Sequence, residues 1–373
     1  MGTGHAHTII AGKIPGLTLS AIADTDEQRL TNFKDYKDIQ QFSDGDALIA
    51  SEGVVDAVLI ATPHYSHTTL GIAALQRGLH VLVEKPISVH KADCQRLIDA
   101  WTNKEQVFSA MFNQRTDAAY RKLRSLIQSG ELGAVQRINW IITDWYRTEN
   151  YYRSGGWRAT WGGEGGGVLL NQCPHNLDLL QWLFGMPSKV TAHCQFGRFH
   201  DIEVEDAVTA LLEYPSGATG VFITTTGEAP GTNRLEVAAD RGKVVIENGA
   251  FKFFRNRQPV PEHLETAESG FEKPEVWQID VPTGAPGEQH NGILKNFTNA
   301  ILKGEALIAP APEGIHSVEL ANAMLYSGFE NTPVTLPLDA AGYEKLLQKR
   351  IQESTYVKPE VKGTGPADLS GSF

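Results

Sequence analysis

Within the first 115 residues, the apolar runs that are candidates for β-strands have no polar face. They lie at 17–23, 54–61, 80–83 and 106–111, and helix-like stretches lie among them at 65–78 and 89–104. A strand that is apolar on both sides is typical of a parallel sheet with helices on both faces. The alternation of such strands with helices predicts an α/β domain with a doubly wound parallel sheet over 1–115.

The pattern changes after residue 116, where several longer segments alternate apolar and polar residues. Alternation with a period of two is typical of antiparallel strands with one covered face. We therefore expect a second, α+β domain at 116–357 with a large open, mostly antiparallel sheet, and a flexible tail rich in glycine and proline at 358–373. The expected elements are helices at 116–129, 292–303 and 312–327, and strands at 135–146, 188–199, 206–214, 218–226, 233–239 and 243–248.

The composition is that of a globular protein too long for one hydrophobic core. The chain has 373 residues, and 33 lysines and arginines against 44 aspartates and glutamates give a net charge of −11. This charge argues against nucleic acid or an anionic membrane as the main partner, because both attract a basic face. The three cysteines have no metal-like spacing, and no run reaches roughly 18 apolar residues. We therefore expect reduced thiols, no metal site and a cytoplasmic protein.

Polar residues follow the apolar strands, where a doubly wound sheet binds its ligands. Asp24 follows the first strand, and the pairs Thr62–Pro63 and Glu84–Lys85 follow the next two. An acid at the position of Asp24 accepts hydrogen bonds from an adenosine ribose and repels a 2′-phosphate, so it favours NAD over NADP. An ordinary surface aspartate in a turn is the alternative.

Several short motifs resemble those of the oxidoreductase family of glucose–fructose oxidoreductase and inositol dehydrogenase. The resemblance implies a Rossmann-like NAD-binding domain, a substrate and oligomerisation domain, and hydride transfer to or from a secondary hydroxyl of a sugar or cyclitol. The motifs occur in the family's order: Asp24 after Leu-Ser-Ala-Ile-Ala, Ala61-Thr62-Pro63 with His67, Glu84-Lys85-Pro86, Asn113-Gln114-Arg115, Gly130-Glu131-Leu132-Gly133, Gly165-Gly166-Gly167-Val168-Leu169 running into His175, and Leu320-Ala321-Asn322-Ala323.

The resemblance also gives meaning to the first residues. A Gly2-Thr3-Gly4 pair without a preceding strand indicates little by itself. Many family members begin with a strand and then Gly-x-Gly-x-Met-Gly-x-x-His-Ala, so the resemblance implies that Gly2 is the third glycine and that Gly2, Gly4 and His5 belong to the cofactor site. The structure should then begin at a loop or helix N-terminus, with the strand before Asp24 beside a gap or sheet edge. A protein that simply starts here, with a shortened first unit, is the alternative.

Lys85 and His175 are the candidate acid–base residues. Oxidation of a secondary alcohol needs a base for the hydroxyl proton and a donor or cation for the developing alkoxide. Lys85 at a strand end can polarise the substrate oxygen, and the family's Lys–Pro bond at this position is often cis. In the family, the residue that matches His175 is the usual general acid/base, and an imidazole suits proton exchange near pH 7. A solvated lysine and a structural histidine are the alternatives.

Asn171 departs from the family pattern. Many sugar and polyol dehydrogenases carry aspartate there, four residues before the histidine, where its carboxylate would hold the imidazolium. Asn171 can hydrogen-bond a substrate hydroxyl or the ring, but it cannot stabilise the cation by charge. Asp178, one helical turn after His175, could supply part of that role, or could be a structural residue of its helix.

Further residues are assigned by motif or by type. Thr62, Pro63, His67, Glu84 and Asn113 are assigned to the cofactor, with helix capping as the alternative for His67. The segments 144–147 and 151–158 are dense in aromatic residues and arginine, which stack on sugar rings and bind oxygen atoms. We expect a loop over the active site there, or alternatively an oligomer contact. The substrate candidates are Arg115, Tyr152, Trp157, Arg158 and Asp178.

Two other functions stay open at this point. Some relatives are glycosidases that oxidise the sugar transiently and then re-reduce it, and others are sugar or nucleotide sensors. The presence of both Lys85 and His175 argues against a sensor. The second domain's sheet should also have an uncovered apolar face, which leads us to expect a homodimer or homotetramer formed through it. The residues available for that sheet's two faces are Val208, Ala210, Leu212, Val221, Ile223 and Ile246.

Overall fold

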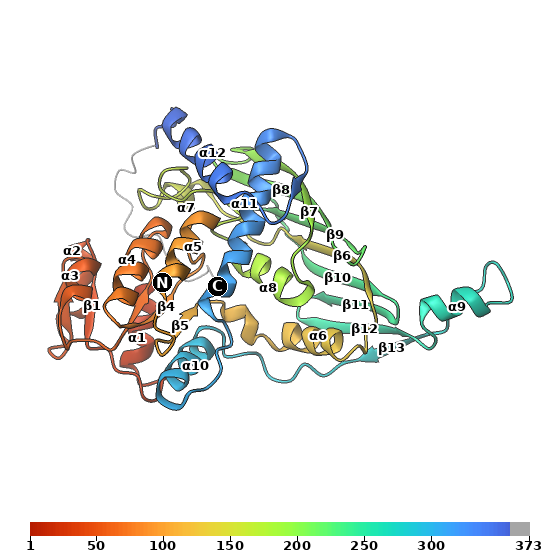
Figure 1. Cartoon of the computed structure of the whole chain (residues 1–373), viewed down its shortest axis with the longest axis horizontal. Coiled ribbons are helices and arrows are strands. Elements are labelled where there is room, and N and C mark those ends of the chain that lie inside the picture. Colours follow the sequence, from red (N-terminus) through yellow and green to blue (C-terminus); the bar gives the residue numbers. More distant parts are fainter. Residues whose placement is uncertain (359–373) are drawn as a thin grey trace. The chain divides into compact units, whose positions relative to one another are not determined.

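The computed structural model describes residues 1–358 and divides into two compact units (Figure 1). Unit 1 comprises Met1–Thr116 and Glu288–Val318, and unit 2 comprises Asp117–Gly287 and the described residues from Glu319 on. The segment Glu288–Val318 thus joins the first unit, although the sequence analysis assigned it to the second domain. Its helix α10 (Gln289–Lys303) carries apolar residues into the core of unit 1. Except for Lys358, the predicted tail lies outside the described residues.

Unit 1 is built on short parallel strands, as its doubly apolar runs predict. β3 (Ala57–Ile60), β4 (His80–Val83) and β5 (Phe108–Ala110) form one parallel sheet, and β1 (Ala21–Ala23) pairs with β2 (Gln40–Phe42) in another. Residues of β4 are fully buried, as expected for a strand covered on both faces. The helices are α1 (Gly2–Ile10), α2 (Glu27–Leu30), α3 (Gly45–Ala50), α4 (His64–Gln76), α5 (Lys91–Ala100) and α10, with 3₁₀ helices at Thr31–Phe33, Asn113–Thr116 and Ala311–Glu313.

The first described element is helix α1, which begins at Gly2. Among residues 1–358, β1 and β3 belong to separate sheets, so the strand before Asp24 has an edge where a doubly wound sheet would continue. The expectation of a helical start and a sheet edge beside that strand is confirmed. A Cβ placed on Gly2 would lie 3.6 Å from the Ala61 Cβ, so α1 begins beside the end of β3.

Unit 2 contains a sheet of nine strands in the order β13-β12-β11-β10-β6-β9-β8-β7-β14. All neighbouring pairs are antiparallel except β6 and β9, which are parallel, so the predicted mostly antiparallel sheet is confirmed. The sequence analysis did not predict β12, β13 or β14. The strands are β6 (Val135–Ile142), β7 (Lys189–Phe196), β8 (Glu205–Glu213), β9 (Thr219–Thr225), β10 (Asn233–Ala239), β11 (Gly242–Glu247), β12 (Ala250–Asn256), β13 (Val276–Asp280) and β14 (Val334–Thr335).

The helices of unit 2 begin where local chemistry favours them. Asp117 accepts the backbone N–H of Ala119 at 2.9 Å at the start of α6 (Ala118–Gln128), and α8 (Pro174–Phe184) opens with a proline. Helix α11 (Gly314–Glu330) packs on β7, where Ala192 N–H donates to Ser327 Oγ at 2.9 Å. The others are α7 (Glu149–Arg153), α9 (Val260–Thr266), which projects beyond the sheet in Figure 1, and α12 (Ala340–Glu353).

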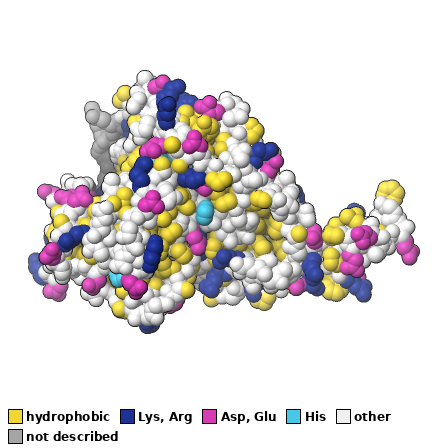
Figure 2. All heavy atoms as spheres, in the orientation of Figure 1, with side chains coloured by type: hydrophobic (Ala, Val, Ile, Leu, Met, Phe, Trp, Pro, Cys, Tyr) yellow, Lys and Arg dark blue, Asp and Glu magenta, His cyan; other side chains and the backbone are white. Residues whose placement is uncertain are grey.

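The two faces of the nine-stranded sheet differ in cover. Val208, Ala210 and Leu212 are buried on one face, whereas Leu211, between two of them along β8, is 45% exposed. The pairing of Leu211 with Val221, which is half-buried, carries the more open face onto β9. On the surface shown in Figure 2, basic and acidic side chains are interspersed. No helix within residues 1–358 is long and apolar enough to span a membrane.

Candidate functional site

The ends of β3 and β4 bring the predicted cofactor residues of unit 1 together. His67 on α4 is buried, with its Nδ1 2.7 Å from the Pro86 carbonyl oxygen and its Nε2 2.8 Å from that of Thr62. The ring therefore links the loop that contains Thr62 and Pro63 to the loop that contains Lys85, which is a stronger role than capping a helix. The Lys85–Pro86 peptide bond is cis, as the family resemblance implies.

Glu84 is a buried carboxylate directly beside Lys85. His5 of α1 donates from Nε2 to Glu84 Oε1 at 2.8 Å, and the Lys85 backbone N–H donates to Glu84 Oε2 at 3.1 Å. Burial alone would raise the pKa of Glu84, but the hydrogen bond and charge of His5 and the charge of Lys85 lower it to about 2. His290 of α10 lies against His5 with ring centroids 5.5 Å apart, and burial lowers its pKa to about 4. At neutral pH the group behind Lys85 is thus an ionised carboxylate.

Asp24 and the N-terminal glycines fit a dinucleotide in separate ways. Asp24 follows β1; its carboxylate accepts the Asp26 N–H at 2.9 Å and lies 3.4 Å from Arg29 Nη1. A Cβ on Gly4 would meet no atom within 4 Å, so the first turns of α1 have open space beside them. Backbone N–H groups at such a helix start suit a pyrophosphate, and the Asp24 carboxylate suits a ribose.

The residues after β5 have partners inside unit 1. Asn113 Nδ2 donates to Gln289 Oε1 at 3.0 Å, so the chain returning through α10 is joined to a predicted cofactor residue. Arg115 is 1% exposed and forms an ion pair with Glu313 while donating to the Ile308 carbonyl at 3.2 Å. Arg115 is thus paired within the unit and holds the return segment in place, and its expected contact with the substrate stays a prediction.

In unit 2, the glycine-rich segment before His175 folds around a buried carboxylate. Glu205 of β8 accepts the backbone N–H of Gly167 at 2.8 Å and of Leu169 at 3.0 Å. A Cβ on Gly167 would lie 2.0 Å from the Glu205 carbonyl oxygen, so this close approach requires glycine. Burial raises the pKa of Glu205 to about 7. His175 follows as the second residue of α8 and is 7% exposed.

Asn171 lies in a network that the sequence analysis did not foresee. Its Nδ2 donates to Glu164 Oε1, and its Oδ1 accepts the Tyr151 hydroxyl at 3.1 Å. Arg158 Nη1 and Gln172 Nε2 donate to the same Tyr151 oxygen, at 2.7 and 3.0 Å. Tyr151, which the sequence analysis did not single out, thus bonds both predicted residues, Asn171 and Arg158.

The other predicted residues of unit 2 divide between this network and the scaffold. Trp157 is half-buried, with the Arg158 guanidinium 4.6 Å from its ring centroid. Tyr152 is 3% exposed and its hydroxyl bonds Thr226 Oγ1 at 2.7 Å. Tyr152 thus packs in the scaffold, and its expected contact with the substrate stays a prediction. Asp178 is fully buried on α8 and accepts Gln181 Nε2 at 3.1 Å, and its suggested role beside His175 stays a prediction.

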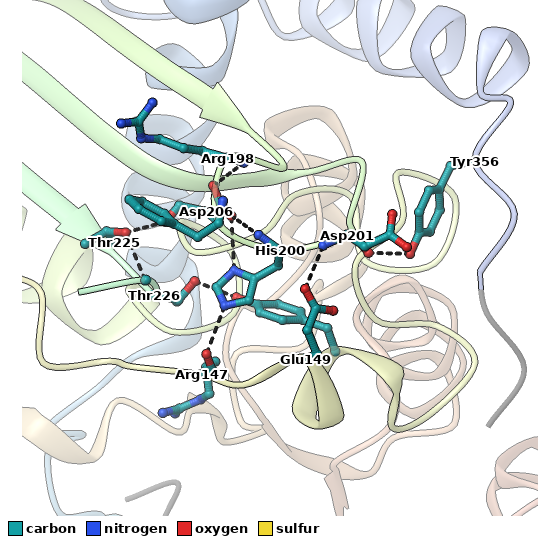
Figure 3. Close-up of polar contacts among 12 residues, drawn as sticks. Arg147, Glu149, Arg198, His200, Asp201, Asp206, Thr225, Thr226 and Tyr356 are labelled. Atoms are coloured by element: carbon teal, nitrogen blue, oxygen red, sulfur yellow. Dashed lines mark hydrogen bonds and ion pairs between the residues drawn. The ribbon is translucent and has the colours of Figure 1, made fainter. Parts of the chain in front are cut away.

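A second network holds the loop that carries Tyr151 (Figure 3). His200 Nδ1 donates to Asp206 at 3.1 Å and its Nε2 donates to the Arg147 carbonyl at 2.9 Å. Both partners accept, so the two bonds favour the protonated ring. Burial alone would lower the pKa of His200, but these bonds raise it. Glu149 accepts the Asp201 N–H at 2.9 Å and extends the network to α7.

Comparisons with known proteins agree with these two units. A family described as "Oxidoreductase family, NAD-binding Rossmann fold" matches residues 1–112, and "GFO/IDH/MocA C-terminal domain" matches residues 120–245. Myo-inositol 2-dehydrogenase of Thermotoga maritima is 26% identical over 258 residues, which are 66% of this chain and 72% of that protein.

Solved structures show the same fold. The WlbA dehydrogenase of Chromobacterium violaceum, in complex with NADH and UDP-GlcNAcA, has a TM-score of 0.75 and 25% identity, and the match covers 91% of this chain and 93% of that one. Levoglucosan dehydrogenase in complex with NADH and levoglucosan has a TM-score of 0.73 and covers 90% of this chain and 96% of its own. At 21% identity, the second likeness bears on the fold alone.

Proposed function

Since the chain belongs to the GFO/IDH/MocA oxidoreductase family, we propose that it is an NAD(H)-dependent dehydrogenase acting on a secondary hydroxyl of a sugar or cyclitol. The observation that carries this proposal is the strand-end arrangement of unit 1. There the buried, ionised Glu84 lies beside Lys85, and His67 joins the Lys85 loop to the end of β3. The name of the inositol dehydrogenase relative supports the substrate class.

The proposed chemistry divides the proton and the hydride between different groups. NAD, when bound, supplies the acceptor for the hydride that leaves the substrate carbon. The ammonium of Lys85 stabilises negative charge on the substrate oxygen as the alkoxide develops. His175 takes the hydroxyl proton, and in the reverse direction returns it to the oxygen. We infer that Asp24 binds the adenosine ribose, which favours NAD over NADP.

The direct test is a screen for NADH formation over monosaccharides, inositols and anhydrosugars. We expect at least one of them to reduce NAD, and His175→Ala to abolish the activity while leaving the melting temperature within a few degrees. A sugar released from a glycoside without net NADH would indicate a redox-assisted glycosidase instead. Ligand binding with no turnover of any kind would indicate a sensor and overturn the proposal.

We also propose that two or four copies assemble through the open face of the nine-stranded sheet. Leu211 is 45% exposed there and pairs with Val221, while Thr209 pairs with Ile223, which gives an apolar centre to this face. Leu211→Glu should yield monomers by light scattering at micromolar concentration, whereas Ser216→Glu in the neighbouring turn should not. A monomeric wild-type protein would contradict this proposal.

We propose that the protein is cytoplasmic. Cys94, Cys173 and Cys194 are buried thiols, which accords with a reducing compartment. Localisation of a tagged, full-length protein by microscopy and fractionation would test this.

A further inference from the structure

Side chains around Asn171 form a hydrogen-bonded chain whose direction is set by chemistry. Arg158 can only donate, so the Tyr151 oxygen accepts from it at 2.7 Å and must give its own proton onward. The Tyr151 hydroxyl therefore donates to Asn171 Oδ1 at 3.1 Å, which leaves Asn171 Nδ2 to donate to the Glu164 carboxylate. Each donor and acceptor follows from the one before it, so the Asn171 carboxamide has one orientation.

The chain closes on itself through the backbone. The second oxygen of the Glu164 carboxylate accepts the Ala159 N–H at 2.7 Å, and Ala159 directly follows Arg158. Ala159 is fully buried and has a φ of 64°, which a residue with a side chain seldom adopts unless its surroundings impose it. Glu164 thus supports at once the turn that presents Arg158 and the amide of Asn171.

The exposure of the segment singles out Asn171. From Glu164 to Leu180 every residue is buried except Asn171, which is half-buried. Asn171 is therefore the one residue of this glycine-rich segment and the start of α8 that is not buried. It lies four residues before His175, on the same short stretch of buried backbone.

The pKa of Glu164 is set by burial and by neighbouring positive charges. Burial raises the pKa of Glu164, whereas the charge of Arg158 and the Asn171 hydrogen bond oppose that rise. Lys358 adds a second positive charge and donates to the Arg158 carbonyl at 3.0 Å. Glu205 is the other carboxylate whose pKa responds to Glu164.

We propose that Glu164 is a positioning residue for substrate recognition, which fixes the Asn171 carboxamide, and with it Arg158, to receive a hydroxyl group of a neutral polyol. This rests on the proposed function, since it assigns a substrate to the segment that carries His175. Glu164 itself does not touch the substrate. Its carboxylate is set one hydrogen bond behind the Asn171 amide, so position 171 offers the substrate a neutral group beside the charged Arg158.

The test exchanges the Glu164 carboxylate and the Asn171 carboxamide between the two positions, first one at a time and then together. In Glu164→Gln, a single oxygen must serve both Ala159 N–H and Asn171 Nδ2, and the new amide N–H faces a donor. In Asn171→Asp, two buried carboxylates face one another. In the double variant, the amide introduced at position 164 accepts from Ala159 and donates to the carboxylate introduced at position 171. The Tyr151 hydroxyl still donates to that carboxylate, so every group is satisfied again.

We expect each single variant to lower the melting temperature and to raise KM about tenfold, with a smaller fall in kcat, because a charge-assisted hydrogen bond is lost or reversed. The double variant should recover the melting temperature. Its KM should stay raised and should vary with pH, because an ionisable carboxylate now occupies the position of the neutral amide. Glu203→Gln is the matched control, since Glu203 accepts the Trp161 N–H of the same loop at 2.8 Å and is outside the network.

The outcomes separate the two proposals. The positioning role is overturned if Glu164→Gln has the wild-type KM. It is also overturned if the melting temperature of the double variant falls by as much as the sum of the losses in the two single variants. Should Glu164→Gln fail to fold, Ala159→Gly, which relieves the left-handed turn, provides a background in which to repeat the measurement. If His175→Ala stays active while the exchange still restores stability, the proposed function fails and the Glu164–Asn171 pairing stands without a role in substrate recognition.

Discussion

The two units hold their buried glutamates in opposite ways. In unit 1, the ring of His5 lies 2.8 Å from Glu84, and this partner lowers the pKa of Glu84 to about 2. In unit 2, Glu205 is held by backbone N–H groups, and burial raises its pKa to about 7. A side-chain hydrogen bond and nearby charges thus keep one carboxylate ionised at ordinary pH values, whereas backbone dipoles alone leave the other close to protonation at neutral pH. The contribution of Glu84 to stability should therefore not vary with pH near neutrality, whereas that of Glu205 should.

The largest expected effect comes from the tight contact in unit 2. Gly167→Ala places a Cβ 2.0 Å from the Glu205 carbonyl oxygen, and a backbone atom cannot move aside cheaply. We expect a loss of about 4 kcal/mol or more in the free energy of unfolding, enough to prevent folding at 37 °C. Thermal unfolding followed by circular dichroism would measure it.

The matched change in unit 1 has the opposite sign. Gly4→Ala adds a Cβ where no atom lies within 4 Å, inside helix α1, so it should stabilise the protein by up to about 1 kcal/mol. The same methyl group should weaken NAD binding if a pyrophosphate lies at this helix start. Destabilisation by Gly4→Ala, or a stable Gly167→Ala, would reverse the comparison.

The opposite pKa directions give a test based on pH. The pKa of Glu205 is raised in the folded state, so its contribution to stability is full below its ordinary pKa of 4.5 and is lost as pH rises through about 7. The free energy of unfolding of Glu205→Gln, measured relative to the wild type, should therefore rise by about 3 kcal/mol between pH 4.5 and 7.5.

Glu84 has the reverse sign. Its pKa is lowered, so its contribution is present above 4.5 and is lost only as pH falls through about 2. Glu84→Gln should be destabilised by a constant amount, about 3 kcal/mol, across pH 5–8. Urea unfolding at intervals of half a pH unit would measure the difference in free energy of unfolding between each variant and the wild type. This difference should change with pH for Glu205→Gln and stay constant for Glu84→Gln. If the two differences changed with pH in the same way, the glutamates would not be held as described.

The candidate catalytic lysine should act on rate more than on binding. Lys85→Ala should reduce kcat about 100-fold or more, because its charge acts on the oxygen as the alkoxide develops. Lys37→Ala, an exposed lysine of the same unit, is the control and should leave kcat unchanged. A change confined to KM would show that Lys85 only binds substrate.

Sequence reasoning placed residues at strand ends where the fold is local. Thr62, Pro63, Glu84 and Lys85 follow β3 and β4 as predicted, and parallel strands bring their ends to one edge of a sheet; their roles in the site stay predictions. What the sequence did not show is the connection of Glu84 to His5 and His290, which lie far from it in the chain. His290 reaches this site only because helix α10 returns to unit 1, and no local pattern indicates which domain a returning helix joins.

In unit 2 the misses follow from the same cause. Glu164 and Glu205 look like ordinary surface acids. Only the folded chain shows that Glu164 accepts the Ala159 N–H and that the glycine-rich segment surrounds Glu205 with backbone N–H groups. The aromatic loop was recognised by composition, yet Tyr152 was chosen over its neighbour Tyr151. A segment without regular periodicity does not reveal which of two adjacent rings bonds Asn171. The glycines of the Gly-Gly-Gly segment were the available signal, because glycine often marks close contact with another backbone.

The smallest effect concerns the exposed edge of unit 1, where the charge of Asp24 is not fully buried. Asp24 has a side chain that is 31% exposed and lies 3.4 Å from Arg29 Nη1. Asp24→Ala removes the repulsion of a 2′-phosphate and releases Arg29 to meet it, so the preference for NAD over NADP should fall about tenfold. Asp26→Ala is the control, because Asp26 also pairs with Arg29 but caps α2 instead of ending a strand. The ratio of kcat/KM for the two cofactors gives the answer, and an equal change in both variants would mean that Asp24 acts only through Arg29 and does not bind the ribose.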